Sequence, residues 1–92
     1  MYYIGVDLGT SSLKLLLMDE KGKIQNIVSK EYNLYFPKEG WAEQNPDEWW
    51  SAVCSAIGDV LKKGNVKPEE IKGIGVDGQS WSAIPIDKDG NV

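Results

Sequence analysis

The chain begins with a short apolar segment and continues as Asp7-Leu8-Gly9-Thr10-Ser11-Ser12-Leu13-Lys14, the part of the sequence that says most about its architecture. Mostly apolar segments lie on both sides of its polar residues, at positions 2–6 and 13–18. The pattern predicts a strand, a tight polar turn and a second strand. The turn holds one carboxylate, one glycine and three hydroxyls, and a lysine follows just inside the second strand. These groups suit the phosphates and the metal ion of a magnesium nucleotide.

Each residue type in this turn could help to bind a phosphate group or its metal ion. Gly9 lets the backbone come close and permits unusual dihedral angles, and successive backbone N–H groups can then surround anionic oxygens. The hydroxyls of residues 10–12 add short donors, and Lys14 adds a positive charge. Asp7 would repel a phosphate directly, so its presence implies a bridging Mg²⁺ with its water ligands, or a substrate hydroxyl.

An ordinary hairpin turn is the alternative explanation, because Gly, Ser and Asp are common in turns for local reasons. Short motifs also match by chance. The stretch differs from two well-known phosphate motifs. It lacks the G-x-x-x-x-G-K-[ST] of a Walker A loop, and the dinucleotide-binding pattern fails because only Gly5 and Gly9 are present and no helix follows.

Composition narrows the class of protein. With 92 residues, 41% hydrophobic and 26% charged, the chain suits one small globular domain at most. Its longest apolar run covers only residues 15–18 and it has no signal-peptide pattern, so we expect no membrane partner and a cytoplasmic protein. A net charge of −4 with scattered basic residues argues against a nucleic acid partner. The absence of histidine and the single Cys54 exclude Ser-His and Cys-His catalysis and an internal disulfide, and disfavour zinc.

The remaining strands follow from similar patterns. A third strand is predicted over residues 24–35, which with the first two makes an antiparallel meander. Later in the chain, residues 68–70 predict a short helical turn and residues 71–77 a further strand. A last short strand is predicted over 83–86, followed by a turn at 87–90.

The single long helix is the clearest prediction of secondary structure. Asn45 suits the N-cap, Pro46 the first helical position, and Glu48 a capping box with Asn45. Gly64 or Asn65 should end the helix. The predicted apolar face consists of Trp50, Val53, Cys54, Ile57, Val60 and Leu61, with Cys54 as a small buried residue.

The order β-β-β-α-β has a consequence for the site. The strand after the helix should run parallel to the first strand, so Asp7 and Asp77 should emerge at the same carboxyl end of the sheet, where open α/β sheets bind ligands. The matching sequences Ile4–Asp7 and Ile74–Asp77 fit this arrangement. One helix and one sheet do not complete a domain, so we expect residues 1–92 to be the N-terminal part of a longer protein.

Three motifs together resemble the N-terminus of the FGGY carbohydrate kinases, which have the α/β, ribonuclease H-like fold of the actin-like ATPases. The first is the stretch from Asp7 to Lys14. The second is Gly40-Trp41-Ala42-Glu43-Gln44-Asn45-Pro46 followed by Trp49-Trp50, and the third is Gly75-Val76-Asp77-Gly78-Gln79. The motifs lie in the family's order over nearly the whole chain, and within the family the likeness is greatest to the xylulokinases.

The resemblance implies a two-domain enzyme that transfers the γ-phosphoryl group of ATP to a sugar hydroxyl with Mg²⁺, with D-xylulose as the leading substrate and D-xylulose 5-phosphate as the product. Asp7 would act near the metal, through water. The phosphate-binding residues would be Gly9, Thr10, Ser11, Ser12 and Lys14. The family's catalytic aspartate would lie beyond Val92, so residues 1–92 alone should be inactive. A homodimer of the full-length protein is a further expectation.

The resemblance also assigns sugar contacts to Gln79, Ser80 and Trp81. Many xylulokinases resemble G-Q-M-H-G at this point, whereas Ser80 and Trp81 follow Gln79 here, which leaves another ketose or polyol open. Trp81 would stack on the sugar or pack between cleft loops. The competing functions are an acetate-kinase-like phosphotransferase and a non-enzymatic, actin-fold nucleotide-binding regulator.

Overall fold

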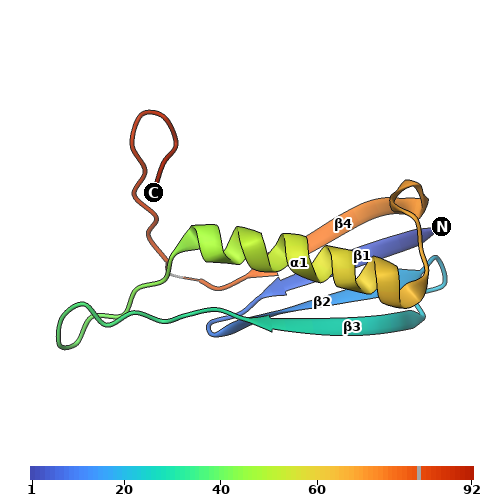
Figure 1. Ribbon diagram of the computed structural model, residues 1–92, viewed down its shortest axis with the longest axis horizontal. Coiled ribbons are helices and arrows are strands. Elements are labelled where there is room, and N and C mark those ends of the chain that lie inside the picture. The colour runs from blue at the N-terminus through green and yellow to red at the C-terminus, as the bar shows by residue number, and fades with distance from the viewer. Residues whose placement is uncertain (81) are drawn as a thin grey trace.

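The computed structural model describes residues 1–80 and 82–92 and shows a four-stranded sheet with one long helix on one face (Figure 1). The elements are β1 (Tyr2–Leu8), β2 (Ser12–Asp19), β3 (Ile24–Glu31), α1 (Pro46–Gly64), the 3-10 helix η1 (Pro68–Glu70) and β4 (Ile71–Gly78). This order confirms the predicted succession β-β-β-α-β. None of the helices in the described residues is long and apolar enough to cross a membrane.

The sheet has the strand order β3-β2-β1-β4. The pairs β1–β2 and β2–β3 are antiparallel, as the predicted meander requires, while β4 runs parallel to β1 on the other side. The parallel register places Asp7 beside Asp77. The carboxyl ends of β1 and β4 therefore meet at one edge of the sheet, as predicted from the element order.

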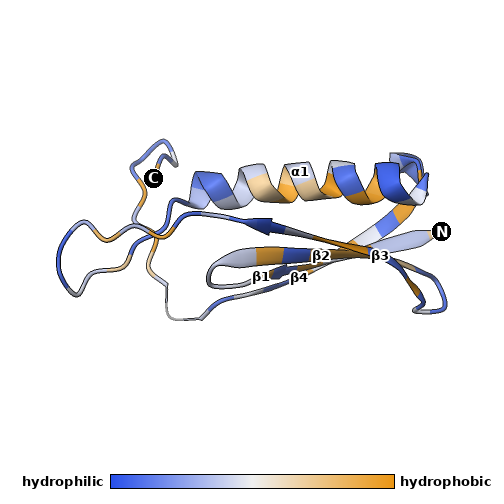
Figure 2. Cartoon of the chain, turned by 60° about the horizontal axis from the view of Figure 1, so that its bottom comes forward, coloured by the Kyte–Doolittle hydropathy of each residue, from blue (hydrophilic) through white to orange (hydrophobic). Residues whose placement is uncertain are grey.

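The hydrophobic core lies between the sheet and α1. Every second residue of β1 and β2 points toward the helix, because side chains alternate along a strand. The helix contributes small residues at four-residue spacing, which lets it pack closely over β2 and β3. Figure 2 shows hydrophobic strand residues beneath the middle of α1. The buried residues are Ile4, Val6, Leu13, Leu15, Leu17, Ala52, Ala56, Val60 and Val66.

Both ends of α1 are capped. At the start, the Asn45 side chain accepts a hydrogen bond of 3.0 Å from the Asp47 N–H, as the N-cap prediction required. At the end, Asn65 adopts a left-handed conformation with φ 52°, and the Val66 N–H donates back to the Leu61 carbonyl at 2.9 Å. This is a Schellman-type stop that satisfies a free helix carbonyl, with asparagine in the place that glycine usually takes.

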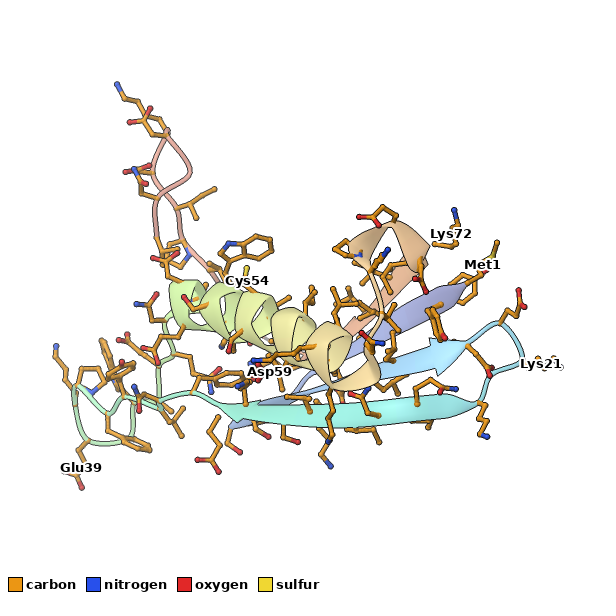
Figure 3. The ribbon with its side chains drawn as sticks, turned by 45° about the vertical axis from the view of Figure 1, so that its right-hand side comes forward. Met1, Lys21, Glu39, Cys54, Asp59 and Lys72 are labelled. Carbon is orange, nitrogen blue, oxygen red and sulfur yellow. The ribbon has the colours of Figure 1, made fainter. Side chains whose placement is uncertain are left out.

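The predicted apolar face of α1 is partly wrong. Trp50 is 69% exposed and Cys54 is also exposed, so Cys54 is not the small buried residue that was expected. Figure 3 labels Cys54 on the upper side of α1, with the strands below. The helix is rotated so that Ala52 and Ala56 face the sheet, because small side chains allow the closest approach of helix and strands.

Two predicted strand segments are also wrong. β3 ends at Glu31 instead of continuing to residue 35, and the chain leaves the sheet as a loop closed by a single bridge between Tyr35 and Glu43. Residues 83–86 form no strand, and within the described residues their backbone makes no hydrogen bond to another segment. The turn at 87–90 is confirmed, with the Gly90 N–H donating to the Asp87 carbonyl at 3.0 Å.

Candidate functional site

Three segments meet at the carboxyl edge of β1 and β4, on the left in Figure 1: the β1–β2 turn, the residues after β4 and the first turn of α1. A hollow of about 450 Å³ lies between them, which we call the edge hollow. Its polar lining includes Thr10, Gln44 and Gln79, and Pro46 and Trp49 add apolar surface. The predicted phosphate turn and the predicted sugar-binding residue Gln79 therefore border one space.

A second hollow, the open-face hollow, lies on the side of the sheet away from α1. It is lined by Gly5, Asp7, Lys14, Leu16, Ile27, Gly75 and Asp77, among others. Asp7 is the cross-strand partner of Lys14 and the parallel neighbour of Asp77, so the three side chains share one face of the sheet. The glycines at positions 5 and 75 have no side chains to fill the floor. Two carboxylates and one ammonium thus lie at the same uncovered surface.

The turn between β1 and β2 needs glycine for a steric reason. The Gly9 N–H donates to the Ser12 carbonyl at 3.0 Å and closes the turn. A Cβ at position 9 would lie 2.8 Å from the same carbonyl oxygen, which is backbone and cannot move aside cheaply. Gly9 is not among the residues with positive φ, so the expectation of unusual dihedral angles there is wrong. Position 9 requires glycine because the backbone there passes close to the Ser12 carbonyl.

The turn presents free donors. In the described part of the chain, the backbone N–H groups of Thr10 and Ser11 have no protein acceptor. Lys14 forms no ion pair there either, since the pair identified joins Lys30 and Asp59 at 2.6 Å. The turn therefore offers two free backbone donors to an anion, and the Lys14 ammonium lies across the β1–β2 pair from Asp7.

The remaining predicted site residues are less closely grouped. Ser12 begins β2 and is half-buried, with its carbonyl used by Gly9. Ser80 is exposed after the end of β4 and lines neither hollow. Trp81 lies outside the described residues, so its predicted sugar contact stays a prediction. The structure thus joins Thr10 with Gln79, and Asp7 with Lys14, but leaves Ser80 apart.

Two residues near the turn were not predicted as functional. The Tyr32 hydroxyl donates to the Gly9 carbonyl, and Gln44 donates from its side-chain amide to the Thr10 carbonyl. Burial raises the pKa of Tyr32, and the negative charge of Asp7 raises it further, so this hydroxyl keeps its proton. Gln44 lies inside a quoted motif, but nothing in the local sequence indicates a contact with a residue 34 positions earlier.

A magnesium nucleotide fits these residues in a limited way. Among the described residues, no three acidic or cysteine side chains gather as a ready-made metal site. Mg²⁺ usually keeps several waters and takes one or two carboxylates together with phosphate oxygens, and Asp7 and Asp77 offer that number. The free N–H groups of the turn suit phosphate oxygens. The donor set therefore fits a hydrated metal–phosphate group rather than a bare ion.

Solved structures of known proteins share this fold. A solved structure described as ligand-bound xylulose kinase from Lactobacillus acidophilus is 36% identical, with a TM-score of 0.89, and covers 98% of this chain and 18% of that one. A structure described as gluconate kinase from the same organism gives the same identity, TM-score and coverage. The architecture is that of the N-terminal domain of the actin-like ATPases to which these sugar kinases belong.

The family follows from the sequence match. Residues 2–92 match the model of the FGGY family of carbohydrate kinases, N-terminal domain, and this chain belongs to that family. A glycerol kinase from Thermus thermophilus is 39% identical over 88 residues. The match covers 96% of this chain and 18% of the relative, so the chain spans about one fifth of the length of the relatives it matches.

Proposed function

We propose that residues 1–92 form the N-terminal part of the first domain of a longer kinase, which transfers the γ-phosphoryl group of ATP to a hydroxyl of a small polyol or ketose. The observation that carries this proposal is the β1–β2 turn, whose N–H groups at Thr10 and Ser11 are free in the described structure and follow Asp7 closely in the chain. Gln79 borders the same edge and supplies a partner for a hydroxyl. The lengths of the matched relatives support the larger size.

Phosphoryl transfer depends mainly on positioning and on neutralisation of charge. In this proposal, the N–H groups of residues 10 and 11 and the Lys14 ammonium hold phosphate oxygens, which fixes the direction of the chain of phosphates. Asp7 holds Mg²⁺ through water, with Asp77 next to it. The metal, when bound, neutralises charge on the phosphates. The general base lies in a later part of the longer protein, so Asp77 is not assigned that role.

The acceptor is the finer part of the proposal. The relatives named above are described as kinases of glycerol, xylulose and gluconate, which differ in length and charge. We place D-xylulose first, because the sequence motifs resemble those of xylulokinases most, and glycerol second. Ser80 and Trp81 stand where many xylulokinases have other residues after Gln79, and this difference is the feature that would change the order of the proposed acceptors.

A coupled ADP-release assay on the full-length protein that carries this chain tests the proposal. The acceptors are D-xylulose, glycerol, gluconate, L-ribulose, L-xylulose and rhamnulose, and Asp7→Ala is the inactive control. Selective turnover of one acceptor, lost in Asp7→Ala, supports the kinase and identifies its substrate. Binding of ATP without turnover of any acceptor would instead favour a regulator or a different phosphotransferase.

A further inference from the structure

Gln44 contacts three segments that are far apart in the sequence. Its Nε2 donates to the Thr10 carbonyl in the β1–β2 turn. Its Oε1 accepts a hydrogen bond of 3.1 Å from the Trp49 indole N–H in α1 and one of 3.0 Å from Nε2 of Gln79, just after β4. The single side chain of Gln44 therefore connects the proposed phosphate turn with the proposed substrate residue, and α1 fixes it in place.

The orientation of the Gln44 amide follows from the chemistry of its neighbours. An indole N–H can only donate and a backbone carbonyl can only accept. Oε1 must therefore face Trp49, and the NH₂ group must face Thr10, because the opposite orientation would set donor against donor and acceptor against acceptor. The Gln79 amide is fixed in turn: it presents its NH₂ group to Gln44, which leaves its own Oε1 without a partner in the described part of the chain.

The same contacts orient the backbone of the turn. The carbonyl of Gly9 accepts from the Tyr32 hydroxyl, that of Thr10 from Gln44, and that of Ser11 from the Tyr32 N–H at 3.2 Å. In a trans peptide the C=O and the next N–H point in opposite directions, and the described chain has no cis peptide. Holding these carbonyls on one side therefore directs the N–H groups of Thr10 and Ser11 to the other side, where they remain free.

We propose that Gln44 is a positioning residue that couples the two ligands of this site. It turns the N–H groups of the phosphate turn outward and, through Gln79, presents a hydroxyl-accepting oxygen to the substrate. A ligand that orders one of these groups then favours the other. This inference rests on the proposed function, and it commits the acceptor to a molecule that donates an O–H to Gln79.

Two variants of the full-length protein separate the contact of Gln44 with the phosphate turn from its contact with Gln79. Gln44→Glu keeps acceptor oxygens for Trp49 and Gln79 but cannot donate to Thr10. Gln44→Met is similar in size and loses all three hydrogen bonds. Gln25→Met is the matched control, because the Gln25 side chain hydrogen-bonds, among the described residues, only to Asp19 and Lys23 around the turn at the opposite end of the sheet.

Steady-state kinetics with ATP and the best acceptor provide the first readout. A lost hydrogen bond to the turn should raise KM for ATP about tenfold in Gln44→Glu while KM for the acceptor changes less than about twofold. In Gln44→Met both KM values should rise, and the acceptor should no longer strengthen the binding of Mg-ADP measured by calorimetry. If Gln44 had only a structural role, its variants would have a lower melting temperature, and KM for ATP would not change more than KM for the acceptor in Gln44→Glu.

Hydrogen–deuterium exchange without ligand provides the second readout. The Gly9 amide, which donates to the Ser12 carbonyl and closes the turn, should exchange faster in peptides from both Gln44 variants, and its exchange should be unchanged in Gln25→Met. Equal exchange in all proteins, or an active wild type with unchanged KM values in Gln44→Glu, overturns the inference and leaves the kinase intact. A wild type that neither binds Mg-ADP nor phosphorylates any acceptor overturns the proposed function, and the coupling with it.

Discussion

At the level of single residues, two glycines show that the same amino acid serves opposite needs in this chain. Gly9 closes a turn so tight that a Cβ would meet the Ser12 carbonyl oxygen at 2.8 Å. Gly58 lies within α1 with no atom within 4 Å of its missing Cβ, so nothing in the described structure requires glycine there. The geometry of the turn requires Gly9, whereas Gly58 only lowers the stability of the helix.

The substitution of these two glycines by alanine should therefore have opposite effects. Gly9→Ala forces the backbone apart and should destabilise the protein by about 1–3 kcal/mol. It should also raise KM for ATP, because the N–H groups at residues 10 and 11 move. Gly58→Ala should stabilise by about 0.5–1 kcal/mol, because glycine loses more backbone entropy on folding. Urea denaturation of both variants checks the signs, and a neutral Gly9→Ala would contradict the steric argument.

At the level of elements, the loop between β3 and α1 is held by the first turn of the helix. Glu48 accepts hydrogen bonds of 3.1 Å from the backbone N–H and the side chain of Asn33, and one from the Tyr35 hydroxyl. The predicted capping box is therefore wrong, since Glu48 turns toward the loop rather than back to Asn45. These contacts hold the beginning of the loop, and the bridge between Tyr35 and Glu43 joins it to the residue before Gln44.

The Tyr35–Glu48 hydrogen bond should make this connection dependent on pH. The Tyr35 hydroxyl lowers the pKa of Glu48 below its ordinary 4.5, and Glu48 raises the pKa of Tyr35 above 10.0. The stabilisation from Glu48 is thus complete above pH 4.5 and is lost as pH falls through the lowered pKa. The contribution of Tyr35 is complete below pH 10.0 and is lost as pH rises through the raised pKa.

Removal of the tyrosine hydroxyl tests this connection. In Tyr35→Phe, the pKa of Glu48 should rise, because its largest cause of lowering is gone while the Asn33 bonds remain. Carbon-detected NMR titration of the Glu48 carboxyl measures the shift. Tyr3→Phe is the control, since within the part of the chain that the structure describes the Tyr3 hydroxyl hydrogen-bonds only to Met1. An unchanged pKa of Glu48 in Tyr35→Phe would show that the hydrogen bond does not form in solution.

The most deeply buried strand residues lie in β2, where α1 packs on the sheet. Leu15 is completely buried in the centre of β2. Leu15→Ala should lower the free energy of unfolding by about 2–5 kcal/mol, because it removes buried methyl groups and leaves a cavity. Ile24→Ala, at a position 51% exposed, should cost far less. Denaturant titration of the two variants gives the comparison, and similar losses would contradict a core centred on β2.

At the level of the whole molecule, the helix covers only part of the sheet. It packs over β2 and β3, while β4 at the edge leaves Ile74 at 56% and Val76 at 74% exposure. Trp50 and Cys54 are exposed on α1 as well. Such apolar surface is costly in water. It agrees with the proposal that further segments of a longer protein cover this side.

Cys54 gives a direct test of that covering. In residues 1–92 alone, the Cys54 thiol should react quickly with a disulfide reagent such as DTNB, because it is exposed. In the full-length protein the reaction should be at least tenfold slower if other segments pack against α1. The unfolded protein serves as the reference for complete access. Equal rates in the short and the long protein would contradict a covered helix face.

Most of the fold could be predicted from the sequence, because it depends on local signals. The polar turn after β1, the Asn45 cap and the apolar alternation in β2 each act within a few residues. The errors occur where distant contacts decide. The rotation of α1 depends on which side chains fit the sheet, and β3 ends at Glu31 because the following residues bond to the β1–β2 turn and to Glu48.

The sequence by itself determined the element order, the parallel pairing that sets Asp7 beside Asp77, and the tight polar turn at residues 9–12, since each follows from short-range propensity or from chain topology. Only the tertiary structure decided what holds that turn. Gln44 reaches Thr10 and Gln79 across 34 and 35 positions of sequence. Such contacts form only after the loop and the helix have packed at the edge of the sheet, so no local pattern encodes them.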